Sequence, residues 1–348
     1  MYTAHFGFQF DPFEPGYRPE RFFDASPFRD AQGRLRSAIA GGDKIMILSG
    51  PSGSGKTTLL KQFLNSWNTA SQILFLEGGV GTFEDVVDYL FTALKLHAPG
   101  YATGEKLNEI YHFLRNAGEA SNRIVLIVDN ADKLPAIAIK QISYLSQASR
   151  PGNLQILFVG SSRLEARFKD SVLTPIGAQI RHWIRLGFLS DEEVGPFINH
   201  CLKQAGYQGT SLFSPSAIES LIRYSAGNPR LIMKLCGFSL LSASIENATQ
   251  VTRTMIDEVA TDCILETESD SFDQGVDRPT QTDASNLVPL LRNVTKPLTR
   301  RSSPLQNANF DLARTEAVIL RCRELGIPHP GIDNSERDPV HPAETNLP

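Results

Sequence analysis

The feature that most constrains this chain is a glycine-rich segment, Gly50-Pro-Ser-Gly-Ser-Gly-Lys56-Thr57, which directly follows the short apolar run 44–49. It fits the pattern G-x-x-x-x-G-K-[ST] at every fixed position, and the residues after it have helical character. Glycines let a backbone turn its N–H groups inward around phosphate oxygens, and the positive end of the following helix faces the same anion. We therefore predict a phosphate-binding loop. A chance Gly/Ser turn is the alternative, and the lysine, the threonine and the leading strand together weigh against it.

The residues of this loop have expected partners in a nucleoside triphosphate. Lys56 is expected to reach the β- and γ-phosphates, and the Thr57 hydroxyl is expected to hold Mg²⁺. We predict that ATP with Mg²⁺ binds to nine consecutive residues, namely Gly50, Pro51, Ser52, Gly53, Ser54, Gly55, Lys56, Thr57 and Thr58.

Length and composition limit the other possibilities. A chain of 348 residues, 41% of them hydrophobic, predicts about two folded units. The formal net charge of −4 provides no overall basic field for nucleic acid. The four cysteines are widely spaced and form no C-x-x-C pair, which is typical of reduced thiols. No signal peptide and no apolar run of about 20 residues is present, so we predict a cytoplasmic protein without a membrane span.

The order of apolar runs predicts an α/β domain followed by a helical bundle. Strand candidates alternate with helical patterns, which indicates a three-layer domain with a mostly parallel sheet; the candidates are 44–49, 72–76, 123–129, 154–159 and 183–188. From the capping box Ser190–Glu193 onward the pattern is purely helical. We predict four segments: an aromatic, proline-rich and irregular arm (1–25), the α/β nucleotide-binding domain (26–189), a helical lid domain (190–265) and a mostly disordered tail (266–348).

Three residues outside the loop are candidate site residues. Asp129 ends a buried strand and is expected to hold Mg²⁺ through water, together with Thr57. Ser161 follows the strand 154–159 and would either orient the attacking water or cap the next helix; both interpretations stay open. Arg230 lies in the first turn of a helix opened by Asn228-Pro229, where it would reach the γ-phosphate or remain solvated.

The order of these motifs resembles the AAA+ ATPases of the ExeA type, which accompany bacterial type II secretion and type IV pilus assembly. The resemblance covers residues 1–265, and it rests on Met1-Tyr2-Thr3, Phe6-Gly7, Asp11-Pro12-Phe13, the phosphate loop, 154–160, 189–193, Ala205-Gly206, 213–215 and 227–232. It implies an ATP-binding core with a helical lid and Arg230 as a nucleotide-sensing arginine. It also implies ring-like self-assembly, in which a neighbouring subunit completes each nucleotide site.

Two departures from the family pattern affect the chemistry. The family has a glutamate after the Mg²⁺-linked aspartate, whereas Asn130 follows Asp129 here. An asparagine hydrogen-bonds water but accepts no proton, so we predict slow hydrolysis, with Asp132 as a substitute base if its side chain points to the site. The family also has Gln-Arg-Ile before the last strand, where this chain has Gln179-Ile180-Arg181. Arg181 is therefore our candidate for the arginine supplied by a neighbouring subunit.

Three functions fit these observations. The leading prediction is an ATP-dependent homo-oligomer that drives or gates assembly of an envelope secretion, pilus or polysaccharide-export system, where a protein partner would recruit it to the inner membrane. The alternatives are a DNA-binding, transposition-type regulator and a nucleotide-gated scaffold with little turnover. The acidic net charge weighs against DNA, and the basic stretch 292–301 keeps that alternative open.

Overall fold

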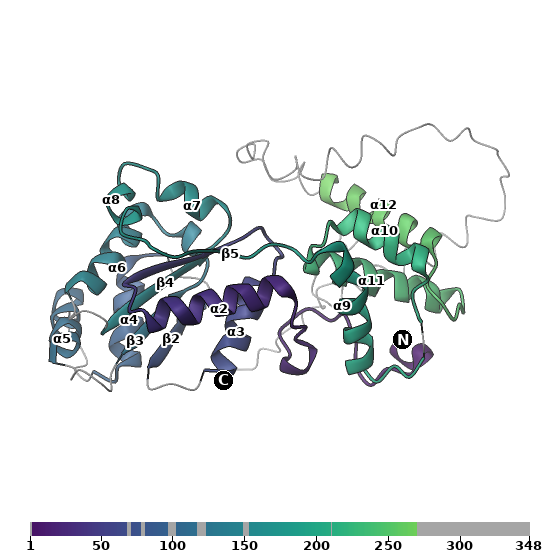
Figure 1. Cartoon of the computed structure of the whole chain (residues 1–348), viewed down its shortest axis with the longest axis horizontal. Helices are drawn as coiled ribbons and strands as arrows, with labels where there is room; N and C mark the ends of the chain where they lie inside the picture. The colour runs from purple at the N-terminus through teal and green to yellow at the C-terminus, as the bar shows by residue number, and fades with distance from the viewer. Residues whose placement is uncertain are drawn as a thin grey trace, which may run out of the picture. The chain divides into compact units, whose positions relative to one another are not determined.

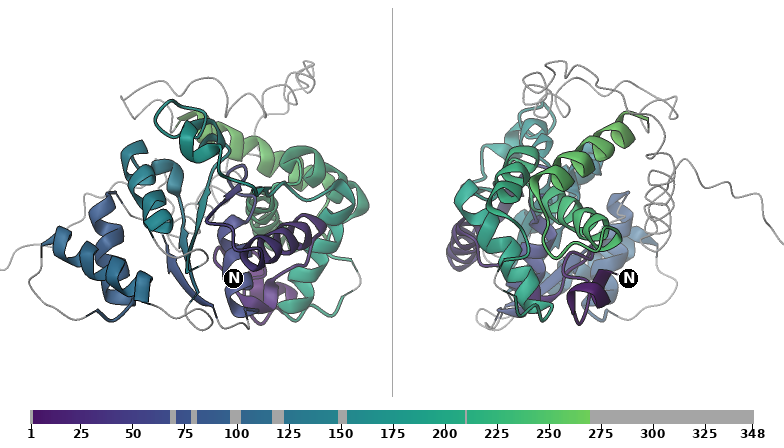
Figure 2. Two further views of the ribbon diagram at one scale, coloured as in Figure 1. Left: turned by 60° about the vertical axis from the view of Figure 1, so that its left-hand side comes forward. Right: turned by 90° about the vertical axis from the view of Figure 1, so that its right-hand side faces the viewer.

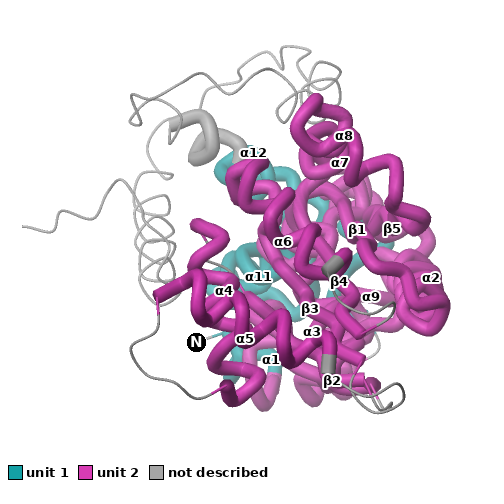
Figure 3. The backbone as a smooth tube through the Cα atoms, turned by 90° about the vertical axis from the view of Figure 1, so that its left-hand side faces the viewer, with its two compact units in different colours: residues 1–6, 210–217, 235–348 teal, residues 7–209, 218–234 magenta. Residues whose placement is uncertain are grey.

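The computed structural model describes residues 2–67, 71–77, 81–96, 102–116, 123–148, 153–209 and 211–269. The chain divides into two compact units (Figure 3): a larger one of residues 7–209 with 218–234, and a smaller one of residues 1–6, 210–217 and 235–348. The predicted domain boundaries after residues 25, 189 and 265 stay predictions. The predicted disorder of the tail falls almost entirely outside the described residues.

The larger unit is built on a parallel sheet of five strands in the order β2-β3-β4-β1-β5. The strands are β1 (Ile45–Ser49), β2 (Gln72–Leu76), β3 (Ile124–Val128), β4 (Leu154–Gly160) and β5 (Trp183–Arg185). All residues of β1, β3 and β4 are buried, as expected of strands covered on both faces. The predicted parallel sheet is confirmed, although β5 is shorter than the predicted strand 183–188.

Helices cover both faces of this sheet (Figures 1 and 2). The helices α2 (Ser26–Ala40) and α3 (Lys56–Asn65) pack together on one face. On the other face α4 (Phe83–Ala93), α5 (Thr103–Asn116) and α6 (Ala136–Ala148) enclose a core with alternate strand residues such as Ile47, Leu126 and Phe158. The predicted three-layer α/β architecture is confirmed.

Four helices follow the sheet in the described chain, and the first and third of them begin at the signals predicted above, the capping box at Ser190 and the pair Asn228-Pro229. These helices are α9 (Asp191–Gln204), α10 (Pro215–Ser225), α11 (Pro229–Ile245) and α12 (Arg253–Ser269). At the start of α9 the Glu193 carboxylate accepts a hydrogen bond from the Ser190 backbone N–H at 3.1 Å, which is half of a capping box. In the smaller unit Phe213 and Val251 form an isolated parallel bridge. Within the described part of the chain, no helix combines the length and the apolar character needed to cross a membrane.

The N-terminal arm contains more regular structure than predicted. Residues Tyr2–Phe6 form the helix α1, and Pro19–Arg21 form the 3-10 helix η1. The expectation of a wholly irregular arm is therefore wrong. It holds for the residues between these two elements, where Pro12 and Pro15 lack the N–H that a helix requires.

Within the larger unit the arm contacts two helices that are far apart in the sequence. The Tyr17 hydroxyl donates to Gln62 Oε1 at 2.8 Å and accepts from Asn65 Nδ2 at 2.9 Å, both on α3. The Phe23 ring packs against α9, with ring centroids 5.8 Å from Phe197 and 5.6 Å from His200. The arm thus joins the helix that follows the phosphate loop to the first helix after the sheet.

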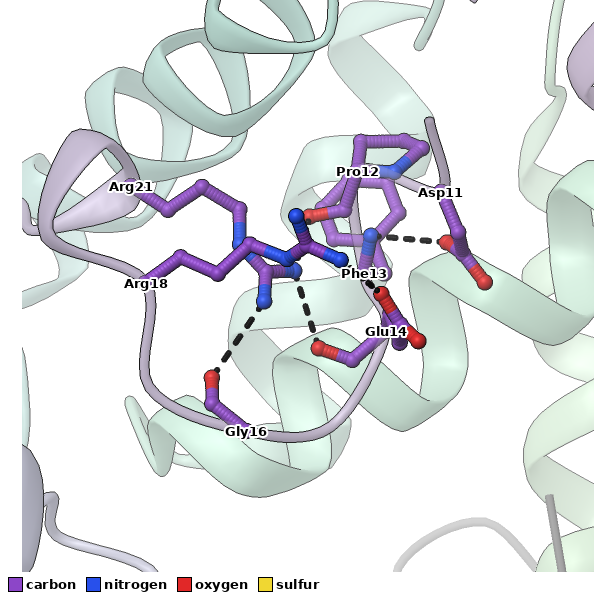
Figure 4. A network of polar contacts seen from close by, with 7 residues as sticks. All are labelled: Asp11, Pro12, Phe13, Glu14, Gly16, Arg18 and Arg21. Carbon is purple, nitrogen blue, oxygen red and sulfur yellow. Dashed lines mark hydrogen bonds and ion pairs between the residues drawn. The ribbon is translucent and has the colours of Figure 1, made fainter. Parts of the chain in front are cut away.

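A buried arginine holds the turn of the arm together (Figure 4). Arg21 is only 7% exposed, and its guanidinium donates to the carbonyl oxygens of Glu14 at 2.9 Å, Gly16 at 3.3 Å and Pro12 at 3.4 Å. Burial lowers the pKa of Arg21 from its ordinary value. The neighbouring Arg18 is exposed and pairs with the Glu14 carboxylate instead. A cation that is desolvated and bonded to three carbonyls fixes the arm in one conformation.

Candidate functional site

The phosphate-loop sequence forms the turn between β1 and α3. Gly53 and Gly55 adopt left-handed backbone conformations with φ of 80° and 91°, and α3 begins directly afterwards at Lys56. The Lys56 ammonium group folds back and donates to the carbonyl oxygens of Gly50 and Pro51, each at 2.9 Å. Burial lowers the pKa of Lys56, and the nearby Asp129 and Asp132 carboxylates oppose this shift. A partly buried ammonium held by neutral carbonyls, next to the N-terminus of a helix, suits a bound phosphate group.

Thr57 and Asp129 meet beside the loop. The Thr57 hydroxyl donates to Asp129 Oδ2 at 2.9 Å, and the other carboxylate oxygen accepts the Asn130 backbone N–H at 2.8 Å. Asp129 is 6% exposed and follows the last residue of β3, two strands away from β1 in the sheet. A hydroxyl and a carboxylate are the hard oxygen ligands that Mg²⁺ prefers. The residues present therefore fit this ion.

Arg230 and Asn228 lie against the phosphate loop within the same unit. The Asn228 side chain donates to the Ser52 carbonyl oxygen at 3.2 Å and accepts the Arg230 backbone N–H at 3.1 Å. The Arg230 guanidinium lies 3.3 Å from Ser52 Oγ. A Cβ atom at Gly53 would lie 2.4 Å from Asn228 Oδ1, so a residue without a side chain is needed for this close approach. The first turn of α11 thus adds a cation and an amide to the loop.

Ser161 contacts Asp132 rather than the loop itself. Its backbone N–H and its hydroxyl donate to the two oxygens of the Asp132 carboxylate, at 3.2 Å and 2.8 Å. The same hydroxyl accepts the Arg163 N–H at 3.3 Å, so Ser161 also satisfies a backbone group at the start of α7 (Arg163–Arg167). The predicted role of Ser161 in orienting water stays a prediction.

Two other predicted site residues, Asn130 and Arg181, are exposed. Asn130 is exposed and adopts a left-handed conformation with φ of 55°, at the start of the short 3-10 helix η2 (Ala131–Lys133). Arg181 is exposed and precedes β5, whose Trp183 pairs with Ile47 in β1. Because the two strands are parallel, Arg181 is at the end of the sheet opposite the phosphate loop. The described chain therefore does not bring Arg181 to its own loop.

An ion pair that no sequence pattern indicated lies beside the loop. Ser49, the last residue of β1, donates its hydroxyl to Glu165 on α7. The same carboxylate binds the guanidinium of Arg185, with Nη2 to Oε2 at 2.6 Å and Nε to Oε1 at 2.8 Å. Arg185 pairs with Ser49 across the two strands, so it lies at the loop end of β5. Only the strand register, which depends on the folded sheet, brings these three residues together.

Comparison with known proteins agrees with this geometry. Residues 39–168 match the family model described as an AAA domain. The fold around the phosphate loop is thus similar to that of an AAA domain. Among solved structures, Cdc6p from Pyrobaculum aerophilum superposes with a TM-score of 0.57 at 15% identity, over 69% of this chain and 67% of that one. The ORC2 protein of Aeropyrum pernix, solved in ADPNP–ADP complexes, gives a TM-score of 0.52 at 11% identity over 90% and 89% of the two chains. At these identities the likeness concerns the fold.

A relative also matches a longer part of the sequence than the AAA family model does. General secretion pathway protein A of Aeromonas hydrophila is 26% identical over 247 residues, which are 70% of this chain. The predicted resemblance to the ExeA group is thereby confirmed. This chain spans 45% of the length of that relative, so less than half of the larger protein has a counterpart here.

Proposed function

We propose that this protein is an ATPase that binds ATP with Mg²⁺ in its AAA domain. One observation carries the proposal: a complete phosphate loop lies next to the Thr57–Asp129 hydrogen bond and is contacted by the Arg230 guanidinium. In this proposal the loop from Gly50 to Thr58 holds the phosphates, Thr57 and Asp129 hold Mg²⁺, and Arg230 contacts the γ-phosphate. When bound, Mg²⁺ neutralises charge on the phosphate oxygens.

Isothermal titration calorimetry with ATP·Mg²⁺ tests nucleotide binding. Lys56→Ala removes the ammonium that would contact the phosphates, so we expect affinity to fall by roughly 10- to 100-fold, the worth of a charged hydrogen bond. Lys61→Ala is the matched control, because Lys61 lies on the same helix and pairs with Glu77 instead. Equal affinity of the wild type and Lys56→Ala would refute the assignment.

The expected turnover is slow. Asn130 accepts hydrogen bonds through its carbonyl oxygen but takes up no proton, and general-base assistance is worth about 10²- to 10⁴-fold. We therefore expect Asn130→Glu to raise kcat while leaving ATP affinity nearly unchanged. A wild type that already turns over at ordinary ATPase rates, with no gain in the variant, would contradict this expectation.

The proposed cellular role is to drive or gate assembly of an envelope secretion, pilus or polysaccharide-export system from the cytoplasmic side. The similarity to General secretion pathway protein A supports this role, and the 45% coverage of that protein keeps it a proposal. The competing role in DNA binding makes a different prediction. With a slowly hydrolysed ATP analogue present, fluorescence anisotropy of a labelled duplex would rise with protein concentration and fall steeply with salt if the protein acts on DNA.

A further inference from the structure

Asp132 is a fixed carboxylate at the edge of the sheet that carries the phosphate loop. It follows β3 by four residues, and Ser161, which follows β4 directly, donates two hydrogen bonds to it. Because β3 and β4 are adjacent and parallel, both residues leave the sheet at the same edge. Arg167 donates to the Asp132 backbone carbonyl at 2.7 Å. A Cβ atom at Gly160 would lie 2.6 Å from Asp132 Oδ1, so the strand ends in the one residue that leaves room for the carboxylate.

The two residues directly after β3, Asp129 and Asn130, are poorly suited to accept a proton. In the proposed function the Asp129 carboxylate holds Mg²⁺, and it also accepts hydrogen bonds from Thr57 and from the Asn130 backbone. The Asn130 amide has no protonation step in the physiological range. An ionised carboxylate offers about four acceptor positions, and Ser161 occupies one on each oxygen of Asp132. Asp132 therefore retains acceptor capacity for a water molecule.

Asp132 also lies close to the phosphate-binding lysine. The Asp132 and Asp129 charges both act to raise the pKa of Lys56, against the larger effect of burial. The ammonium expected to hold the β- and γ-phosphates is thus within electrostatic reach of this carboxylate. A general base for hydrolysis has to lie near the γ-phosphate and in hydrogen-bond reach of the attacking water.

We propose that Asp132 is the substitute general base for the slow ATP hydrolysis expected of this protein and that Ser161 is its positioning residue. This inference rests on the proposed ATPase function. In the step, Asp132 takes one proton from a water molecule as the water oxygen forms a bond to the γ-phosphorus. The bond between the γ-phosphorus and the β–γ bridging oxygen breaks, and its electron pair stays on ADP. The products are ADP and inorganic phosphate, and Asp132 then releases the proton to solvent.

Asp132→Asn tests the proposal because it keeps the shape of the side chain and removes its basicity. We expect kcat to fall by roughly 10²- to 10⁴-fold, while the Kd of a fluorescent ATP analogue changes by less than about threefold. Adding Asn130→Glu to Asp132→Asn should restore turnover, because it returns a carboxylate to the same turn.

Asp170→Asn is the matched control, because Asp170 is an exposed aspartate outside the contacts described above. Ser161→Ala leaves the carboxylate in place and removes one of its two hydrogen bonds, so we expect a smaller loss of kcat with an unchanged Kd of the ATP analogue, and Ser161→Thr, which keeps the hydroxyl, should retain the wild-type kcat. Wild-type kcat in Asp132→Asn, with nucleotide binding intact, would overturn the proposal. If that variant fails to fold, an unchanged kcat in Ser161→Ala would overturn it instead. Failure of the wild type to bind the analogue would refute the proposed function itself.

Discussion

Arg230 shows how a single residue acquires a defined position beside the loop. Asn228 accepts the Arg230 backbone N–H and donates to the Ser52 carbonyl oxygen, so its side chain links the start of α11 to the phosphate loop. The guanidinium then lies 3.3 Å from Ser52 Oγ without a carboxylate among the contacts that fix it. Among the described residues no carboxylate forms an ion pair with Arg230, and a bound γ-phosphate would supply an anionic partner.

We predict that Arg230→Gln lowers ATP turnover by roughly 10- to 100-fold, since a hydrogen bond to a charged group is worth about 1.5–3 kcal/mol. Steady-state phosphate release measures the effect. Arg34→Gln is the control, because Arg34 pairs only with Asp30 on the exposed side of α2. Equal losses in both variants would indicate a general effect of removing arginine.

At the residue scale the sequence predicted positions better than contacts. The loop, Asp129 and the first-turn position of Arg230 follow from local patterns, because each depends on the residues next to it in the chain. The contact of Ser161 with Asp132 and that of Glu165 with both Ser49 and Arg185 join residues 20 or more positions apart. Such pairs depend on the sheet register, which no local pattern specifies.

At the element scale, the structure of the N-terminal arm differs most from the one predicted from its sequence. Prolines and aromatic residues predicted an irregular segment, yet part of it is helical and its turn is organised around the buried guanidinium of Arg21. Charged side chains are seldom buried, so the sequence alone predicts that an arginine in this arm is exposed. Its cage of carbonyl oxygens comes from the arm's own backbone, and only the folded turn reveals it.

We predict that Arg21→Leu lowers the free energy of unfolding by about 2–3 kcal/mol, because three carbonyl oxygens lose a charged donor. Chemical denaturation followed by circular dichroism measures the change. Arg18→Leu is the matched control: Arg18 lies three residues earlier with 45% of its side chain exposed, and such a surface pair is worth about 0–1 kcal/mol. Similar losses in both variants would contradict a special role for the buried residue.

The contact between the arm and α9 predicts a pH dependence. Burial lowers the pKa of His200, and hydrogen bonding with the backbone of Glu20 and Phe22 opposes this shift. Below the unfolded pKa of about 6.5, the unfolded chain takes up a proton more readily than the folded one, so stability falls as the pH drops from that value towards the folded pKa. His200→Gln should make the melting temperature less dependent on pH in this range. If the melting temperatures of the wild type and His200→Gln changed with pH in parallel, His200 would not be the source of the pH dependence.

At the scale of the whole molecule, the position of Arg181 bears on the predicted self-association. Arg181 is exposed and precedes the edge strand β5, at the end of the sheet opposite the phosphate loop. An arginine in this place serves a nucleotide site only if that site belongs to another copy of the chain. The ATP-dependent self-association predicted from the sequence would supply that second copy.

We predict that a slowly hydrolysed ATP analogue promotes assembly of the full chain into oligomers, measured by native mass spectrometry and light scattering. Lys56→Ala should remain unassembled under the same conditions, because its nucleotide site is impaired. Arg181→Ala should assemble but hydrolyse ATP more slowly. A wild type that remains monomeric at high concentration, with and without nucleotide, would refute the prediction.

Because Arg21 is buried, limited proteolysis with trypsin can measure how often the arm opens. Trypsin cuts after arginine and lysine but not before proline, and within residues 2–28 the only such residues are Arg18, which precedes Pro19, and Arg21. Counted along the chain from residue 2, the bond between Arg21 and Phe22 is therefore the first that trypsin can cut. We expect this bond to be protected while the guanidinium stays bonded to the carbonyl oxygens of Pro12, Glu14 and Gly16. The rate of this one cleavage reports how often the arm leaves α3 and α9, in the native protein and without any label.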